Sequence, residues 1–348
     1  MSAIAGQLLD WHRVHGRHDL PWQHDRSPYR VWVSEIMLQQ TQVATVVPYY
    51  LRFLEAFPNV RALARAAEDE VLALWSGLGY YRRARHLHAA AREVAGRLSG
   101  ALPRDAATLE ALPGLGRSAA AALAAFSSGE RGAILDGNVR RVLARHRGVE
   151  GDPQSAAVSA KLWALARRLV PRAHVAAYTQ GMMDLGATLC TRARPRCGEC
   201  PVAGDCVARR EDRVDELPGR RATRERPRRE VQILWIERAG ETLLVRRPSN
   251  GVWGRMWSLP EASVADDPVA VAREHLGIRA TLVGRLEPIE HAFTHYALTM
   301  HPSRLAASSS QRSERAETAW IAHTDLDGAA LPAPIRRLLA ATRGEARA

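Results

Sequence analysis

The chain has four cysteines, and all of them fall within one short segment in the pattern C-x6-C-x2-C-x5-C: Cys190, Cys197, Cys200 and Cys206. Thiolates gathered this closely are typical of a single metal or iron–sulfur site. A structural zinc site usually presents two C-x2-C pairs separated by a longer insert, whereas this segment has a single C-x2-C with one cysteine on each side. The pattern therefore favours a [4Fe–4S] cluster, with a zinc site and two disulfides as the alternatives.

Length and charge limit the remaining possibilities. With 348 residues and 46% hydrophobic composition, the chain can bury two cores. Its formal net charge of +12 indicates a polyanionic partner, most simply nucleic acid, although an arginine-rich proteome would produce the same excess. We find neither a secretion signal nor an apolar stretch long enough to cross a membrane, so we expect a soluble intracellular protein.

The hydrophobic pattern divides the chain in two. Residues 1–215 show apolar positions at helical spacing and predict an all-helical domain. Within it, Ser27 before Pro28 predicts a helix start, and Pro48 predicts an interruption.

The second part begins after a charged segment that contains proline and glycine, residues 216–230, which we interpret as a linker. Residues 231–348 then predict a smaller α+β domain. VQILWIER and ETLLVRR are β-rich runs separated by Ala-Gly, which predicts a hairpin, and DPVAVAREHLGI predicts a helix.

The segment LPGLGRS, residues 112–118, lies between two helical patterns. Gly114 and Gly116 allow the backbone to approach a phosphate closely, and the start of the following helix offers free N–H groups to an anion. The segment therefore predicts a helix–hairpin–helix motif, for which an ordinary helix–helix turn is the alternative.

Two carboxylates are candidates for chemistry. Asp136, in ILDGNVRRVL, follows an apolar run and stands where a helix begins, so it could simply be a helix N-cap. Glu35 has Val31, Trp32 and Leu38 among its helical neighbours and no nearby cation to pair with. Such a carboxyl can hold its proton near neutral pH, although a partly exposed helix glutamate is the plain alternative.

Several longer stretches occur in a recognisable order: LPWQHDRSPYRVWVSEIMLQQTQVATV, LWSGLGYYRRARHLH, LPGLGRS, ILDGNVRRVLARH and GMMDLGATLCTRARPRC. Together with the cysteine pattern they span nearly all of residues 11–206. On these residues the chain resembles the endonuclease III superfamily of DNA glycosylases, and within it the adenine-specific family. The resemblance implies a multidomain protein, in which an all-α helix–hairpin–helix glycosylase domain with a [4Fe–4S] loop precedes an α+β Nudix-like domain.

The resemblance also implies roles for individual residues. Glu35 aligns with the general acid that protonates adenine at N7, which improves the leaving group. Asp136 would remain ionised and stabilise the cationic sugar, as paired carboxylates do in sugar hydrolases. Asn138 would orient this arrangement.

The implied DNA contacts are more numerous. The target base must leave the stack, and inserted side chains offset part of that cost. The residues concerned are Gln40, Thr41 and Gln42 in the strand-invading segment, Leu78 and Tyr80 as wedges, and Gly114, Gly116, Arg117 and Ser118 in the hairpin. Trp22 and Gln180 would line the adenine pocket, and Arg192, Arg194 and Arg196 would meet phosphates.

Lysine content separates two kinds of enzyme. Bifunctional members of the superfamily carry a lysine nucleophile directly after the Gly-Arg of the hairpin, where this chain has Ser118. Lys161 is the only lysine in the sequence and lies far from the motif. Since a Schiff-base lyase requires the amine, we expect a monofunctional glycosylase that leaves an abasic site.

The C-terminal part resembles a Nudix fold without its metal box. GRMWSLPEASVADDPVAVAREHLGI keeps Arg273, Glu274 and Gly277 but lacks the Glu-Glu pair that binds Mg²⁺, and its spacing differs. The triplet Phe293-Thr294-His295 matches the family loop that recognises 8-oxoguanine. Many relatives have serine where this chain has Thr294, and an ordinary strand with alternating faces is the alternative.

The expected function is release of adenine mispaired with 8-oxoguanine or guanine in double-stranded DNA. The protein is expected to act as a monomer in the cytoplasm, at the bacterial nucleoid, with no membrane partner. The alternatives are a thymine or pyrimidine glycosylase on the same scaffold, a lesion-binding protein without activity, and a Nudix-type nucleotide pyrophosphatase. The long LQQTQ segment, the two carboxylates and the missing Glu-Glu pair argue against these in turn.

Overall fold

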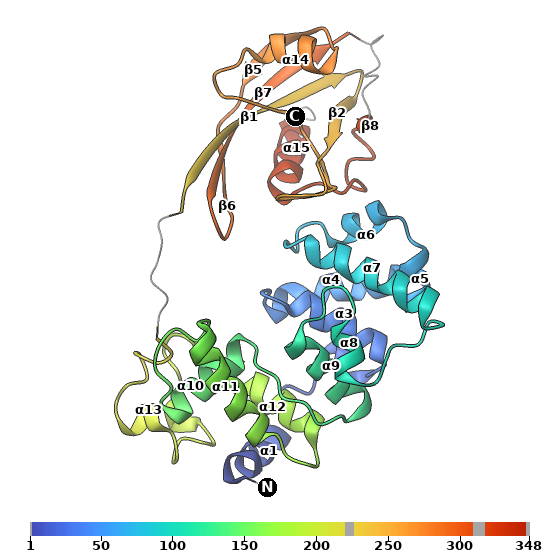
Figure 1. The fold of residues 1–348 in the computed structure, drawn as a ribbon. Helices are drawn as coiled ribbons and strands as arrows, with labels where there is room; N and C mark the ends of the chain where they lie inside the picture. The colour runs from blue at the N-terminus through green and yellow to red at the C-terminus, as the bar shows by residue number, and fades with distance from the viewer. Residues whose placement is uncertain (1, 220–225, 309–316, 346–348) are drawn as a thin grey trace. The chain divides into compact units, whose positions relative to one another are not determined.

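The computed structural model describes residues 2–219, 226–308 and 317–345 (Figure 1). The chain forms two compact units, one of Met1–Arg65 with His86–Thr223 and one of Ala66–Arg85 with Arg224–Ala348. Part of the predicted linker, residues 220–225, lies outside the described residues. Among the described residues, no helix has the length and apolar character needed to cross a membrane.

The first unit is helical, as predicted. Its helices are α1 (Ala3–His15), α2 (Pro21–His24), α3 (Pro28–Leu38), α4 (Val43–Ala56), α5 (Val60–Arg65), most of α7 (Arg82–Arg97), α8 (Ala106–Glu110), α9 (Arg117–Ser128), α10 (Gly137–Arg147), α11 (Ala156–Leu169), α12 (Val175–Thr188), a 3₁₀ turn η1 (Cys197–Glu199) and α13 (Val207–Arg210). The N-terminal helix α1 lies beside α12, so the two ends of the helical sequence share one core (Figure 1).

Local signals explain where α3 begins, but not the course of α4. Ser27 caps α3, because its hydroxyl accepts a hydrogen bond from the backbone N–H of Arg30, and Pro28 occupies the first turn. The predicted interruption at Pro48 is wrong, since Pro48 lies inside α4. Burial of one helix face, including Tyr50 and Phe53, stabilises α4 enough to offset the missing N–H of the proline.

Within its described residues, the second unit contains an eight-stranded mixed sheet of β1 (Arg228–Arg238), β2 (Glu241–Arg246), β3 (Trp257–Ser258), β4 (Glu261–Ala262), β5 (Ala280–Arg285), β6 (Ile289–Ala292), β7 (Ala297–Ala307) and β8 (Thr318–Ala322). Strand β1 runs parallel to β7 and antiparallel to β2. The predicted hairpin is confirmed: Ala239 and Gly240 form its turn, with φ angles of 42° and 80°. Strand β1 starts inside the segment interpreted as a linker.

Helices α14 (Pro268–Leu276) and α15 (Ala333–Glu345) lie on either side of this sheet (Figure 1). The predicted helix at DPVAVAREHLGI is confirmed as α14, capped by the Asp267 carboxylate at its start and by Gly277, with φ 70°, at its end. Val271 and Ala272 of α14 pack on Leu234 and Leu305 of the sheet.

The second unit also includes α6 (Glu68–Trp75) and the turn that follows it. The Asp69 carboxylate accepts hydrogen bonds from both terminal nitrogens of Arg246 on β2, at 2.5 and 2.6 Å. The Ser76 hydroxyl donates to the carbonyl oxygen of Leu331 at 2.6 Å. These contacts place a segment from the helical part of the sequence against the strand domain.

Candidate active site and cysteine cage

Asp136 is held at the start of α10 by backbone groups. Its carboxylate accepts a hydrogen bond of 2.7 Å from the N–H of Val139, so the N-cap prediction is confirmed. The preceding residue is fixed as well, because the Ser118 hydroxyl on α9 accepts a hydrogen bond of 2.9 Å from the N–H of Leu135. Ser118 therefore positions the segment that carries the carboxylate, a role that the sequence did not reveal.

Glu35 and Asp136 come together although about a hundred residues of sequence separate them. Burial, and to a lesser extent the negative charge of Asp136, raises the pKa of Glu35 to about 8. Burial also raises the pKa of Asp136, but the backbone N–H groups of Val139 and Asn138 and the charges of Arg141 and Arg140 oppose that rise. The pair is thus asymmetric in its surroundings: hydrogen bonds and positive charges that favour ionisation act on Asp136, whereas burial and a negative charge act on Glu35.

Arg141, one turn into α10, links this site to the cysteine segment. Its guanidinium donates to the Asn138 side-chain oxygen at 2.8 Å, to the Gly186 carbonyl at 2.7 Å and to the Cys190 carbonyl at 2.7 Å. A side chain at Gly186 would collide with Asn138, since a Cβ there would lie 2.5 Å from the Asn138 Cβ. Arg141 therefore orients Asn138, and the sequence alone gave no reason to select it.

The predicted helix–hairpin–helix is present as α8, the turn and α9. Gly114 has a φ of 82°, and a Cβ there would lie 2.7 Å from the His86 Cβ, so glycine is required. Gly116 is the N-cap of α9 and is exposed, which leaves the helix start open to an anion. The Arg117 guanidinium lies 4.0 Å from the centre of the Trp163 ring.

The segment after α3 contacts this hairpin through Gln39, whose side-chain nitrogen donates to the Gly114 carbonyl at 3.5 Å. The predicted strand-invading residues follow directly. Gln40 is exposed in the left-handed region, with a φ of 59°, Thr41 is half-buried, and Gln42 is exposed as the N-cap of α4. A residue held in this strained conformation is frequently part of a binding site.

The two predicted wedge residues differ in exposure. Tyr80 has 48% of its surface exposed and a φ of 49°, whereas Leu78 is only 5% exposed. The Arg83 guanidinium lies 5.2 Å from the centre of the Tyr80 ring. Both wedge residues belong to the second unit, in the turn after α6.

The two predicted adenine-pocket residues are buried. Trp22 on α2 packs edge-on against Tyr50, with ring centres 5.3 Å apart. Gln180 on α12 donates its side-chain N–H to Asp184 at 2.8 Å, and Asp184 also accepts from the Arg17 guanidinium. Gln180 is therefore held in a fixed orientation by an ion-paired carboxylate.

All four cysteines are free thiols and line one cavity, together with Arg145, Arg196 and Arg209. Burial, together with the charges of the three other cysteines, raises the pKa of Cys200 to about 11. Across the described residues, no group of three or more histidine, cysteine or acidic side chains converges to hold a single ion. Four cysteines around one cavity are the ligand set of a [4Fe–4S] cluster and also of a structural zinc site, so the residues present fit a thiolate-bound metal group.

The predicted recognition loop lies in the second unit within a group of aromatic rings. The Phe293 ring centre is 5.1 Å from Trp253, 4.6 Å from His291 and 4.7 Å from Tyr296. Thr294 and His295 are exposed at the tip of the loop. Trp253 itself has a φ of 56°, a strained conformation that its ring contacts help to maintain.

Comparisons with known proteins agree with this architecture. Residues 33–168 match the HhH-GPD superfamily of base excision DNA repair proteins, and residues 232–341 match the NUDIX domain. The chain is 32% identical to an adenine DNA glycosylase of Buchnera aphidicola over 97% of both chains. It is 36% identical to the human adenine DNA glycosylase over 88% of this chain and 67% of that protein. A thermostable thymine-DNA glycosylase structure covers 60% of this chain and 95% of its own, with 28% identity and a TM-score of 0.54.

The fold and the matched families define a DNA N-glycosylase with an appended Nudix-like domain. Within that class, the chain belongs to the family of adenine DNA glycosylases.

Proposed function

We propose that the protein hydrolyses the N-glycosidic bond of adenine mispaired with 8-oxoguanine or guanine and leaves an abasic site. The asymmetry of Glu35 and Asp136 carries this proposal. A carboxyl with a pKa near 8 holds a proton for the purine ring at neutral pH. A second carboxylate, fixed by backbone N–H groups, stabilises the positive charge that develops on the sugar.

We further propose that the enzyme lacks lyase activity. The lysine nucleophile of bifunctional relatives is replaced by Ser118, and the Ser118 hydroxyl is occupied by the N–H of Leu135. Lys161, the only lysine, lies exposed on α11. Without an amine at the hairpin, a Schiff base with the sugar cannot form there.

Recognition of the base opposite adenine is assigned to the Phe293-Thr294-His295 loop. The exposed Thr294 hydroxyl and His295 ring are available for polar contacts, and the half-buried Phe293 ring offers a stacking surface. We therefore assign catalysis to residues 1–215 and recognition to residues 231–348, within one monomer that acts on double-stranded DNA at the nucleoid.

We propose that Cys190, Cys197, Cys200 and Cys206 hold a [4Fe–4S] cluster. Breaking a glycosidic bond needs no electron transfer, so the cluster would shape the loop that carries the exposed Arg192, Arg194 and Arg196. The purified protein should be brown, with broad absorption near about 400 nm. A colourless protein that contains zinc would contradict this assignment.

The proposed activity is tested with a duplex that contains one A:8-oxoguanine pair, developed with and without alkali. Duplexes with A:G, A:T and T:G pairs run beside it. Adenine release with strand breakage only after alkali supports a monofunctional adenine glycosylase. Strand breakage without alkali would contradict the absence of lyase activity, and base release only at T:G would favour a thymine glycosylase.

A further inference from the structure

Arg145 on α10 is buried, with 4% of its surface exposed, and its guanidinium lies among the cysteines. It donates to the Cys190 sulfur at 3.5 Å and to the carbonyl of Thr191 at 2.6 Å. It also donates to the carbonyls of Arg192 at 3.3 Å and Leu217 at 2.8 Å. In the part of the chain that the structure describes, its hydrogen-bond partners are one sulfur and three carbonyl oxygens, with no carboxylate.

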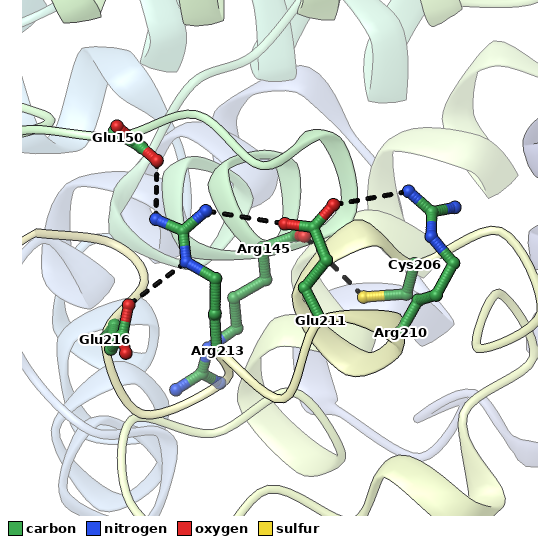
Figure 2. A network of polar contacts seen from close by, with 7 residues as sticks. All are labelled: Arg145, Glu150, Cys206, Arg210, Glu211, Arg213 and Glu216. Carbon is green, nitrogen blue, oxygen red and sulfur yellow. Dashed lines mark hydrogen bonds and ion pairs between the residues drawn. The ribbon is translucent and has the colours of Figure 1, made fainter.

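Two other arginines of the same unit are paired with carboxylates. Arg17 bonds the buried Asp184 carboxylate at 2.7 Å. Arg213, which follows the cysteine segment in the sequence, pairs with Glu150, Glu211 and Glu216 (Figure 2). A buried cation is stabilised by a nearby negative charge, and among the described residues no carboxylate supplies one to Arg145.

The sulfurs would supply a negative charge on binding metal. Cysteine ligands bind as thiolates, and four thiolates outweigh the charge of the iron–sulfur core, so the loaded cage is anionic. The Cys206 thiol also approaches the backbone carbonyl of Arg145, at 3.6 Å (Figure 2). The Cys206 thiol would lose this proton on binding metal, whereas the N–H donors of the Arg145 guanidinium would remain.

We propose that Arg145 is the charge partner and a positioning residue of the iron–sulfur cluster, an inference that rests on the proposed cofactor. Its side chain connects the start of the cysteine segment, at Cys190 to Arg192, with Leu217 beyond its end. Its positive charge stabilises the more negative, reduced state of the cluster. Hydrogen bonds and charges around the sulfurs are the means by which a protein sets cluster potential and retention.

The test compares full-length wild type with Arg145→Gln, Arg145→Lys and the control Arg209→Gln. Arg209 lines the same cavity but is exposed. Iron content, the rate of iron loss to a chelator and the one-electron reduction potential are measured. Arg145→Gln should make reduction of the cluster about tenfold less favourable, which lowers the reduction potential by about 59 mV. It should also speed iron loss about tenfold. Arg209→Gln should change neither.

Arg145→Lys separates the two roles and remains informative if the glutamine variant does not fold. It keeps the charge, so its potential should stay close to that of wild type. One ammonium group cannot span the Thr191 and Leu217 carbonyls, so iron loss should still be faster. Two results overturn this inference alone, provided that the wild type contains iron. One is an unchanged rate of iron loss in the lysine variant, and the other is an unchanged reduction potential in a folded glutamine variant. Wild type without iron overturns the cofactor proposal and this inference together.

Discussion

The carboxylate pair of the helical unit and the aromatic loop of the sheet unit are built by different means. Asp136 is fixed by bonds to backbone groups of its own helix, and Ser118 fixes the residue before it. Phe293 is held by rings from several segments of the second unit, including Trp253 and Tyr296. Fixed dipoles suit a site where charge develops during a reaction, whereas aromatic faces suit a site that discriminates between bases.

Of the changes that test this comparison, removal of the Glu35 proton should have the largest effect on activity. Glu35→Gln keeps the shape of the side chain but removes the transferable proton, so adenine release should fall by about 10²- to 10⁴-fold. Duplex binding should persist. Single-turnover base release and gel-shift binding measure the two, with the exposed Glu110→Gln as the control. Adenine release at the wild-type rate would mean that Glu35 is not the general acid.

Asp136→Asn separates charge from helix capping. The amide oxygen of asparagine can still accept the N–H of Val139, so α10 should remain capped while the charge that stabilises the sugar is lost. Base release should fall about 10²- to 10³-fold with little change in melting temperature. Asp267→Asn, the matching cap of α14, should leave both unchanged. A large drop in melting temperature for Asp136→Asn alone would indicate a structural role.

The pH dependence tests the protonation state of Glu35. Its pKa is raised to about 8, and the protonated form is the active one, so base release should be retained below that pH. Above it, release should fall about tenfold per pH unit as the proton is lost. Single-turnover rates across this range measure the effect. A rate that rises through pH 8 would mean that the ionised form is active.

Phe293→Ala tests the recognition region without removing a domain. Loss of one stacking surface should lower the preference for 8-oxoguanine over guanine about tenfold. Val283→Ala, an exposed apolar change on β5, is the control. Deletion of residues 231–348 is less specific, because it also removes the Arg246 partner of Asp69. An unchanged preference for 8-oxoguanine in Phe293→Ala would mean that the Phe293 ring does not take part in recognition.

The smallest effect is expected at Ser118. Ser118→Ala leaves the Leu135 N–H without its acceptor and should lower the free energy of unfolding by about 1 kcal/mol. Denaturant unfolding measures this loss, and Ser118→Thr should restore the acceptor. An alanine variant as stable as wild type would mean that water replaces the hydroxyl.

Local patterns determined much of the fold. Ser27 with Pro28, Ala239 with Gly240, and Asp267 with Gly277 each fix a backbone conformation within a few residues, so the helices and the hairpin could be predicted. Pro48 could not, because its local penalty is outweighed by burial of the α4 face, which depends on the rest of the core.

The candidate site shows the same division. The sequence by itself singled out the four cysteines, the hairpin and both carboxylates as candidates, and the resemblance to a known family supplied their expected roles. Only the tertiary structure decided that Glu35 lies close enough to Asp136 to have its pKa raised by that charge. It also decided that Arg141 orients Asn138 and that Arg145 reaches Cys190. Burial and long-range hydrogen bonds arise from elements distant in sequence, so no local pattern encodes them.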